Sequence, residues 1–178
     1  MQSGRLAFVA CVACVACVVC AAIAVTLEAS SQSDEQAFVR EAVQSNLGEV
    51  QLGELAAQRA ETDTVRKFGE TLRMDHQAAL QRAMNLAKSL KVEAPTEPST
   101  EVRGIYDGLS QLSGSEFDAA FVSHMITVHE SAIAKYSRNA NSDDDAVAAM
   151  VADALPKLKA HLAMAQALQK GAPAHARH

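Results

Sequence analysis

The chain has 178 residues, enough for one core of moderate size, and it carries a formal net charge of −5. Its apolar share of 49% comes mainly from Ala, Leu, Val and Met, with only 4% aromatic residues, which favours closely packed helices. The acidic balance and the lack of a basic run in the body exclude nucleic acid as an expected partner, because binding phosphates requires a basic patch.

Residues 1–29 are predicted to be an export signal. Arg5 precedes an uncharged run of 22 residues, Leu6 to Leu27, and Leu27-Glu28-Ala29 roughly fits a small-residue cleavage site. The run is also long enough to span a bilayer, so an uncleaved anchor is the alternative and the one expected membrane contact. Either interpretation predicts a protein of the periplasm or cell envelope.

All four cysteines lie inside this hydrophobic run, where we interpret them as small apolar residues of the signal: Cys11, Cys14, Cys17 and Cys20. The exported body has no cysteine, so neither disulfides nor thiolate ligands are expected there.

Residues 30–170 are predicted to form one four-helix bundle domain, followed by a mobile tail over 171–178. Apolar residues repeat in steps of three and four along four stretches, with helices expected at about 34–60, 62–91, 114–139 and 143–170. Expected N-caps are Ser33 with Gln36, Thr62 or Asp63, Ser113 with Glu116, and Ser142 before three aspartates.

The connections predict the topology. The connection near residue 61 is very short, so the first two helices should run antiparallel. About 21 residues with two prolines, Pro95 and Pro98, separate the second helix from the third, which is enough to run the length of a bundle. Thr100 to Leu112 is expected to hold a short helix.

Three of the four expected helices carry a histidine in the apolar stripe: His76, His129 and His161. The remaining helix carries Glu49 on the shoulder of its stripe, and all four positions lie near the same height in a bundle. Helical bundles build metal sites from inward side chains of facing helices, so these four residues are the candidate metal ligands. Zn²⁺, Fe²⁺ or Cu²⁺ would suit this donor set.

The competing interpretation is a purely structural polar layer, in which Glu49 pairs with a histidine and no metal binds. The sequence does not decide between Glu49 and Glu54 as the carboxylate of this layer. A further set of residues near the candidate ligands is given a secondary role: Asp75, Asp118, Met125 and Glu130. Asp75 adjoins His76 but points about 100° away from it, which makes it a doubtful partner for that ring. Met125 lies one turn before His129 and Met164 three residues after His161, where a thioether would favour copper, but the favoured interpretation of both is that they fill the core.

The ordered series of segments resembles a family of bacterial exported proteins, a domain of unknown function with a ferritin-like bundle. The segments are Phe38–Ala42, Asn46–Ala56, Phe68–His76, Ser113–Asp118, His129–Glu130 and Leu155–Leu162, within about residues 36–169. The resemblance implies a ferritin-like four-helix bundle with a long crossover between the second and third helices, and no established activity.

One departure from ferritin-like proteins limits what the resemblance implies. Their di-iron sites use Glu-x-x-His on two helices, but the residue three before His76 is Arg73, and three before His161 is Leu158. A di-iron centre is therefore not expected, nor is oxidase or iron-storage activity. The two hypotheses are a bundle that binds one metal ion for sensing, buffering or protection, and a non-enzymatic envelope protein with a metal-free polar layer. An enzyme with a mononuclear site is the third, less favoured hypothesis.

Overall fold

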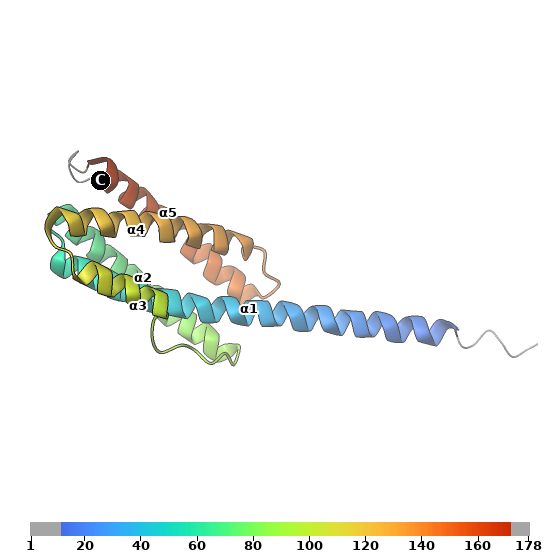
Figure 1. Cartoon of the computed structure of the whole chain (residues 1–178). Coiled ribbons are helices and arrows are strands. Elements are labelled where there is room, and N and C mark those ends of the chain that lie inside the picture. Colours follow the sequence, from blue (N-terminus) through green and yellow to red (C-terminus); the bar gives the residue numbers. More distant parts are fainter. Residues whose placement is uncertain (1–11, 172–178) are drawn as a thin grey trace, which may run out of the picture. The chain divides into compact units, whose positions relative to one another are not determined.

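The computed structural model describes residues 12–171, with side chains from residue 32 onward. In this range the chain is all-helical, which confirms the all-α class (Figure 1). The helices are α1 Val12–Arg59, α2 Asp63–Ser89, α3 Thr100–Ser110, α4 Gly114–Arg138 and α5 Asp145–Gly171. The side chains of the expected export signal and the tail beyond Gly171 lie outside the described residues.

The chain divides into two units, Met1–Glu35 and Gln36–His178, and the arrangement below is that of the second unit. Four helical segments contribute most of its core, namely the part of α1 from residue 36, α2, α4 and α5, and α3 adds Leu109. The short α3 packs against α4 and lies in the connection from α2 to α4. These features define a helical, bundle-like fold.

The core consists of two apolar clusters with a polar layer between them. One cluster gathers Phe38 to Val43 of α1, Leu80 to Ala87 of α2, and Val147 to Leu158 of α5. The other gathers Leu52 to Ala60 of α1, Val65 to Leu72 of α2, and Phe117 to Met125 of α4. Between the two clusters, the four core segments of α1, α2, α4 and α5 carry buried polar residues, which form the polar layer: Asn46, Glu49, His76, His129 and His161.

The helix boundaries correct three expectations. The first helix does not begin at Asp34 with Ser33 as its N-cap, since α1 begins at Val12. No glycine or proline lies between Val12 and Leu47, so nothing in that stretch stops a helix. The cap of α2 is Thr62, as one of the two expected alternatives, and its side chain accepts a hydrogen bond from the Val65 amide.

The other two corrections concern α4 and α5. Ser113 is the N-cap of α4, but its side chain makes no capping hydrogen bond, and the first helical residue, Gly114, has a φ of 60°, a conformation that glycine adopts without strain. At α5 the capping side chain is Asp144 rather than Ser142. Its carboxylate accepts hydrogen bonds from the amides of Ala146 and Val147 over 2.8 and 3.0 Å.

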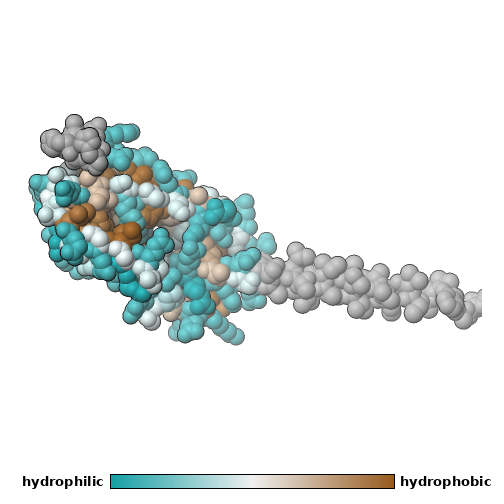
Figure 2. Space-filling model, viewed as in Figure 1, coloured by the Kyte–Doolittle hydropathy of each residue, from teal (hydrophilic) through white to brown (hydrophobic). Residues whose placement is uncertain are grey.

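The described surface is mostly hydrophilic on the face that Figure 2 shows. Among the described side chains the large exposed hydrophobic residues are Met74 and Met84, which are 57% and 43% exposed. Within the described part of the chain, no helix has the length and apolar character needed to cross a membrane.

A glycine contact brings α1 and α2 close together beside the polar layer. A Cβ added at Gly53 would lie 2.8 Å from both the Arg73 amide nitrogen and the Gly69 carbonyl oxygen. A Cβ added at Gly69 would lie 2.8 Å from the Gly53 carbonyl oxygen. Because these atoms belong to the backbone, neither position has room for a side chain unless the two helices move apart.

We predict that Gly53→Ala lowers the free energy of unfolding by about 1–3 kcal/mol, because overpacking at the contact outweighs the better helix propensity of alanine. Gly104→Ala is the matched control, since Gly104 lies within α3 with no other atom within 4 Å of an added Cβ. That control should raise stability by about 0.5–1 kcal/mol. Urea denaturation measures both, and equal effects of the two substitutions would contradict the close contact.

Candidate metal centre

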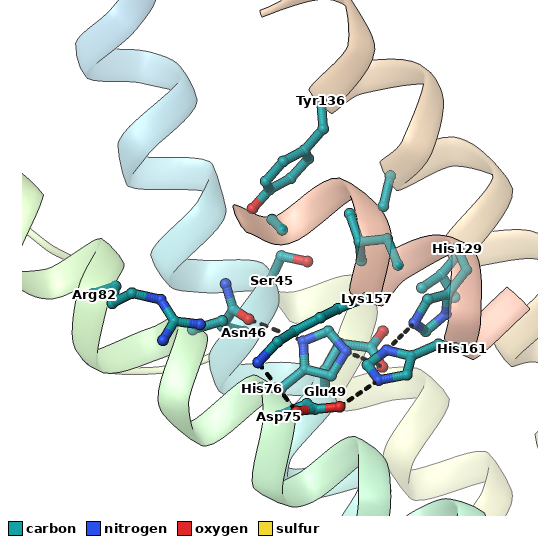
Figure 3. Close-up of a pocket in the computed structure, with 15 residues that line it drawn as sticks. Ser45, Asn46, Glu49, Asp75, His76, Arg82, His129, Tyr136, Lys157 and His161 are labelled. Atoms are coloured by element: carbon teal, nitrogen blue, oxygen red, sulfur yellow. Dashed lines mark hydrogen bonds and ion pairs between the residues drawn. The ribbon is translucent and has the colours of Figure 1, made fainter. Parts of the chain in front are cut away.

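Three imidazoles from three helices meet in the polar layer. His76 of α2, His129 of α4 and His161 of α5 are all buried, with exposed fractions of 7%, 1% and 2%. Each offers one ring nitrogen, and these nitrogens lie within 4.8 Å of one another (Figure 3). Each histidine occupies the core stripe of its helix, so the packing of the helices itself brings the rings together.

The outer nitrogen of His76 is held by Asn46 of α1. The Asn46 amide nitrogen donates to the Ala42 carbonyl over 2.7 Å, which directs its oxygen toward the ring. His76 Nδ1 lies 2.9 Å from that oxygen. An amide oxygen only accepts, so we assign the proton of neutral His76 to Nδ1 and a free lone pair to Nε2.

The same logic assigns the other two rings. His129 Nδ1 lies 2.9 Å from the Met125 carbonyl oxygen, so Nδ1 carries the proton and Nε2 the lone pair. His161 Nε2 lies 2.9 Å from Asp75 Oδ2, so Nε2 donates to the carboxylate and Nδ1 keeps the lone pair. Lys157 donates to the other Asp75 oxygen over 3.3 Å.

These assignments make three lone pairs converge. His129 Nε2 and His161 Nδ1 are only 3.3 Å apart, yet neither carries a proton when both rings are neutral. Two lone pairs at this distance repel unless a positive charge lies between them. A proton or a metal ion can supply that charge.

Glu49 of α1 completes the layer on the side of His76. Its Oε2 lies 4.0 Å from His76 Nε2, which is too long for a hydrogen bond. Both of these atoms are buried and have no hydrogen-bond partner among the described residues. An unsatisfied buried polar atom costs about 1–3 kcal/mol, so two of them facing each other require an explanation.

The electrostatics keep most of these groups neutral near pH 7. Burial raises the pKa of the Glu49 carboxyl from 4.5 to about 8. Burial, together with the charges of the neighbouring histidines, lowers the pKa of His76 well below 6.5. Burial and the charge of His161 lower the pKa of His129 to about 4. Glu49 and His76 are therefore not an ion pair in the metal-free protein.

Asp75 behaves differently because it is only partly buried. Burial raises its pKa, but the hydrogen bonds from His161 and Lys157 outweigh that effect, so the net pKa lies below its ordinary value. Asp75 is thus a carboxylate at neutral pH. It does not orient the ring of its neighbour His76, and instead holds His161 of α5.

The remaining residues with an expected role lie elsewhere. Glu54 and Glu130 are exposed. The Asp118 carboxylate accepts hydrogen bonds from Glu61 and Thr62, so it holds the connection between α1 and α2. Met125 contributes its carbonyl to the site, while its side chain packs in the apolar core.

Two residues in the layer had no role in the sequence interpretation. Asn46 lies in the apolar stripe one turn before Glu49, and a buried amide in such a stripe is itself a signal of a polar partner. Lys157 follows Pro156 on α5, and no spacing in the sequence links it to Asp75.

The fold and the site define an all-α protein with a buried cluster of three histidines contributed by three helices. The model of one protein family, a domain of unknown function (DUF4142), matches residues 21–168. The chain belongs to this family. Comparisons with curated proteins and with solved structures found no match.

The pKa shifts predict how the stability of the metal-free protein depends on pH. His76 and His129 have lowered pKa values, so the stability that depends on their neutral form is fully present above pH 6.5 and is lost as the pH falls below it, in the case of His129 toward its pKa of about 4. Glu49 has a raised pKa, so its contribution is present below pH 4.5 and is lost as the pH rises to about 8. Stability should therefore peak near pH 6–7.

We predict that Glu49→Gln removes the loss on the alkaline side, which for the wild type is about 2 kcal/mol between pH 6.5 and 8. Glu54→Gln, at an exposed position, is the control and should keep the wild-type profile. Thermal unfolding after dialysis against a chelator measures these profiles. If both variants follow the wild-type curve above pH 6.5, Glu49 is not the buried titrating carboxyl.

Proposed function

We propose that this protein binds one divalent transition-metal ion in the buried layer, with His76, His129, His161 and Glu49 as its ligands. The observation that carries the proposal is the convergence of three imidazole lone pairs, each opposite a ring N–H that is held by an acceptor. Metal-binding histidines are oriented in this way, with the second nitrogen bonded to a carbonyl or a carboxylate.

A metal-free layer explains fewer of the contacts. A proton between His129 and His161 would relieve the repulsion across their 3.3 Å separation. It would leave Glu49 Oε2 and His76 Nε2 apart at 4.0 Å, and the protonated Glu49 carboxyl would have to move closer before it could donate to His76. One cation that contacts all four groups satisfies both pairs at once, which is why we favour metal over the structural layer.

The donor set limits the choice of ion. Three imidazoles and one carboxylate suit Zn²⁺, Fe²⁺ or Cu²⁺, and they disfavour Mg²⁺ and Ca²⁺, which prefer oxygen. Zn–N bonds of about 2.0–2.1 Å in a tetrahedron imply ligand separations near 3.3 Å. The His129–His161 separation of 3.3 Å already matches, whereas Glu49 and His76, at 4.0 Å, would move inward.

The proposal includes a fold and a location. The four core segments and the long connection through α3 support a ferritin-like four-helix bundle, over a domain of residues 30–170, with that connection as the crossover. The uncharged run at the N-terminus supports export to the periplasm or envelope. The donor set supports a single ion rather than a di-iron centre, and we place the function in metal buffering, sensing or protection.

We predict that the full chain, purified without a tag and with its cysteines alkylated, binds about one equivalent of Zn²⁺ or Cu²⁺ after dialysis. His76→Gln should lose this equivalent, because it removes a ligand while nearly preserving side-chain size. His124→Gln is the matched control: His124 is half-buried on α4, outside the cluster, and its loss should leave the metal content unchanged.

Elemental analysis measures the content, and thermal unfolding measures its effect. A free metal concentration 100 times its Kd should stabilise the wild type by about 2.7 kcal/mol, and a chelator should reverse this. Equal metal content in the wild type and His76→Gln, with no effect of the chelator, would end the proposal in favour of the structural layer.

Asp75 should act as a positioning residue through His161. Replacing a carboxylate that orients a ligand histidine typically weakens metal binding by about 10–100-fold, and we expect this for Asp75→Asn. Asp63→Asn is the control, since Asp63 lies on the same helix, pairs with Arg66 at the exposed surface and is not among the residues around the histidine cluster. Competition titration with a chromophoric chelator gives both constants, and an unchanged Kd for Asp75→Asn would contradict the role of the 2.9 Å contact.

A further inference from the structure

A cavity of about 40 Å³ is lined by the four proposed metal ligands together with residues beside them. Since one water needs roughly 10–15 Å³ by this measure, the space exceeds what a single ion between its ligands would fill. The rest of the lining includes small side chains, which leave this room: Ser45, Ala79, Ala132 and Ala154. The cavity is far smaller than the roughly 300–1,000 Å³ of sites for organic ligands, so only a group of a few atoms fits.

The wall of this cavity also carries two cations, Lys157 and Arg82. Arg82 pairs with Asp153 over 2.9 Å and is thereby neutralised. Lys157 bonds Asp75, and its side chain is 39% exposed, so it links the cavity to solvent. Figure 3 shows Lys157 and Asp75 beside the histidine rings.

The charges of the loaded site do not cancel. Asp75 and Lys157 are partly exposed and offset each other through their 3.3 Å contact, which leaves the divalent ion and the Glu49 carboxylate as the charges of the buried layer. Because the three histidines are neutral ligands, one positive charge remains in a largely buried region. Such a charge is costly unless a counter-charge accompanies it.

We propose that a small inorganic monoanion occupies this cavity as an additional ligand of the ion, with Lys157 attracting it. This inference rests on the proposed metal site and deepens it, because it names the class of exogenous ligand. The size of the cavity restricts that ligand to ions of the size of a halide, hydroxide or azide. An organic carboxylate with an aromatic ring is too large.

The experiment uses Cu²⁺-loaded full chain, tag-free and with alkylated cysteines. Metal content is measured first, so that failure of the metal site is recognised separately. Azide is then titrated while the visible absorption and the electron paramagnetic resonance spectrum are recorded. We expect a saturable change that reports azide bound to copper, and no such change with benzoate.

Two variants test the assignment to this cavity. Lys157→Met should retain its copper but weaken azide binding by roughly fivefold, as expected for the loss of one charge near the site. Lys159→Met is the matched control, because Lys159 is exposed on the same helix and outside the cavity wall, and it should bind azide like the wild type. Ala132→Val should retain copper and weaken azide binding by reducing the space.

Three outcomes would overturn the inference while leaving the metal site standing. One is a copper-loaded wild type whose spectra do not respond to azide. Another is equal azide affinity in Lys157→Met and Lys159→Met. The third is a response to benzoate as strong as the response to azide.

Discussion

The repulsion between two unprotonated nitrogens is the constraint from which the site follows. His129 Nε2 and His161 Nδ1 face each other across 3.3 Å, and acceptors on the far side of each ring hold the protons away from this gap. The two acceptors are a helix carbonyl and a partly buried carboxylate on a third helix, so neither ring can flip without losing a hydrogen bond. A cation in the gap turns this arrangement from unfavourable to favourable.

The polar layer divides the core, and the apolar clusters on either side support it. Unsatisfied Glu49 and His76 atoms cost about 1–3 kcal/mol each, a large part of the 5–15 kcal/mol stability of a typical domain. Packing on both sides, including the glycine contact of α1 and α2, holds the helices close enough to keep the layer buried. Metal binding would then satisfy the same buried atoms that lower the stability of the metal-free protein. Binding of the ion would therefore stabilise the folded core itself.

Periodicity predicted the helices and the histidine cluster, because a residue in an apolar stripe must face the core whichever way the helices pack. That argument predicts that His76, His129 and His161 face the core. It also places Glu49 at the edge of the apolar stripe of its helix, close to the histidines. It could not place Asp75, which lies off its stripe and meets His161 86 positions away along the chain. The start of α1 and the cap of α5 were also missed, since several polar residues compete for each terminus and local geometry decides among them.

Crystals of the metal-loaded protein, with anomalous diffraction recorded at the absorption edge of the ion, test the central claim most directly. We predict one strong anomalous peak in the polar layer of the core, bonded to His76 Nε2, His129 Nε2, His161 Nδ1 and a Glu49 oxygen. Density for this layer without an anomalous peak, or a peak bonded only to residues outside it, would contradict the account.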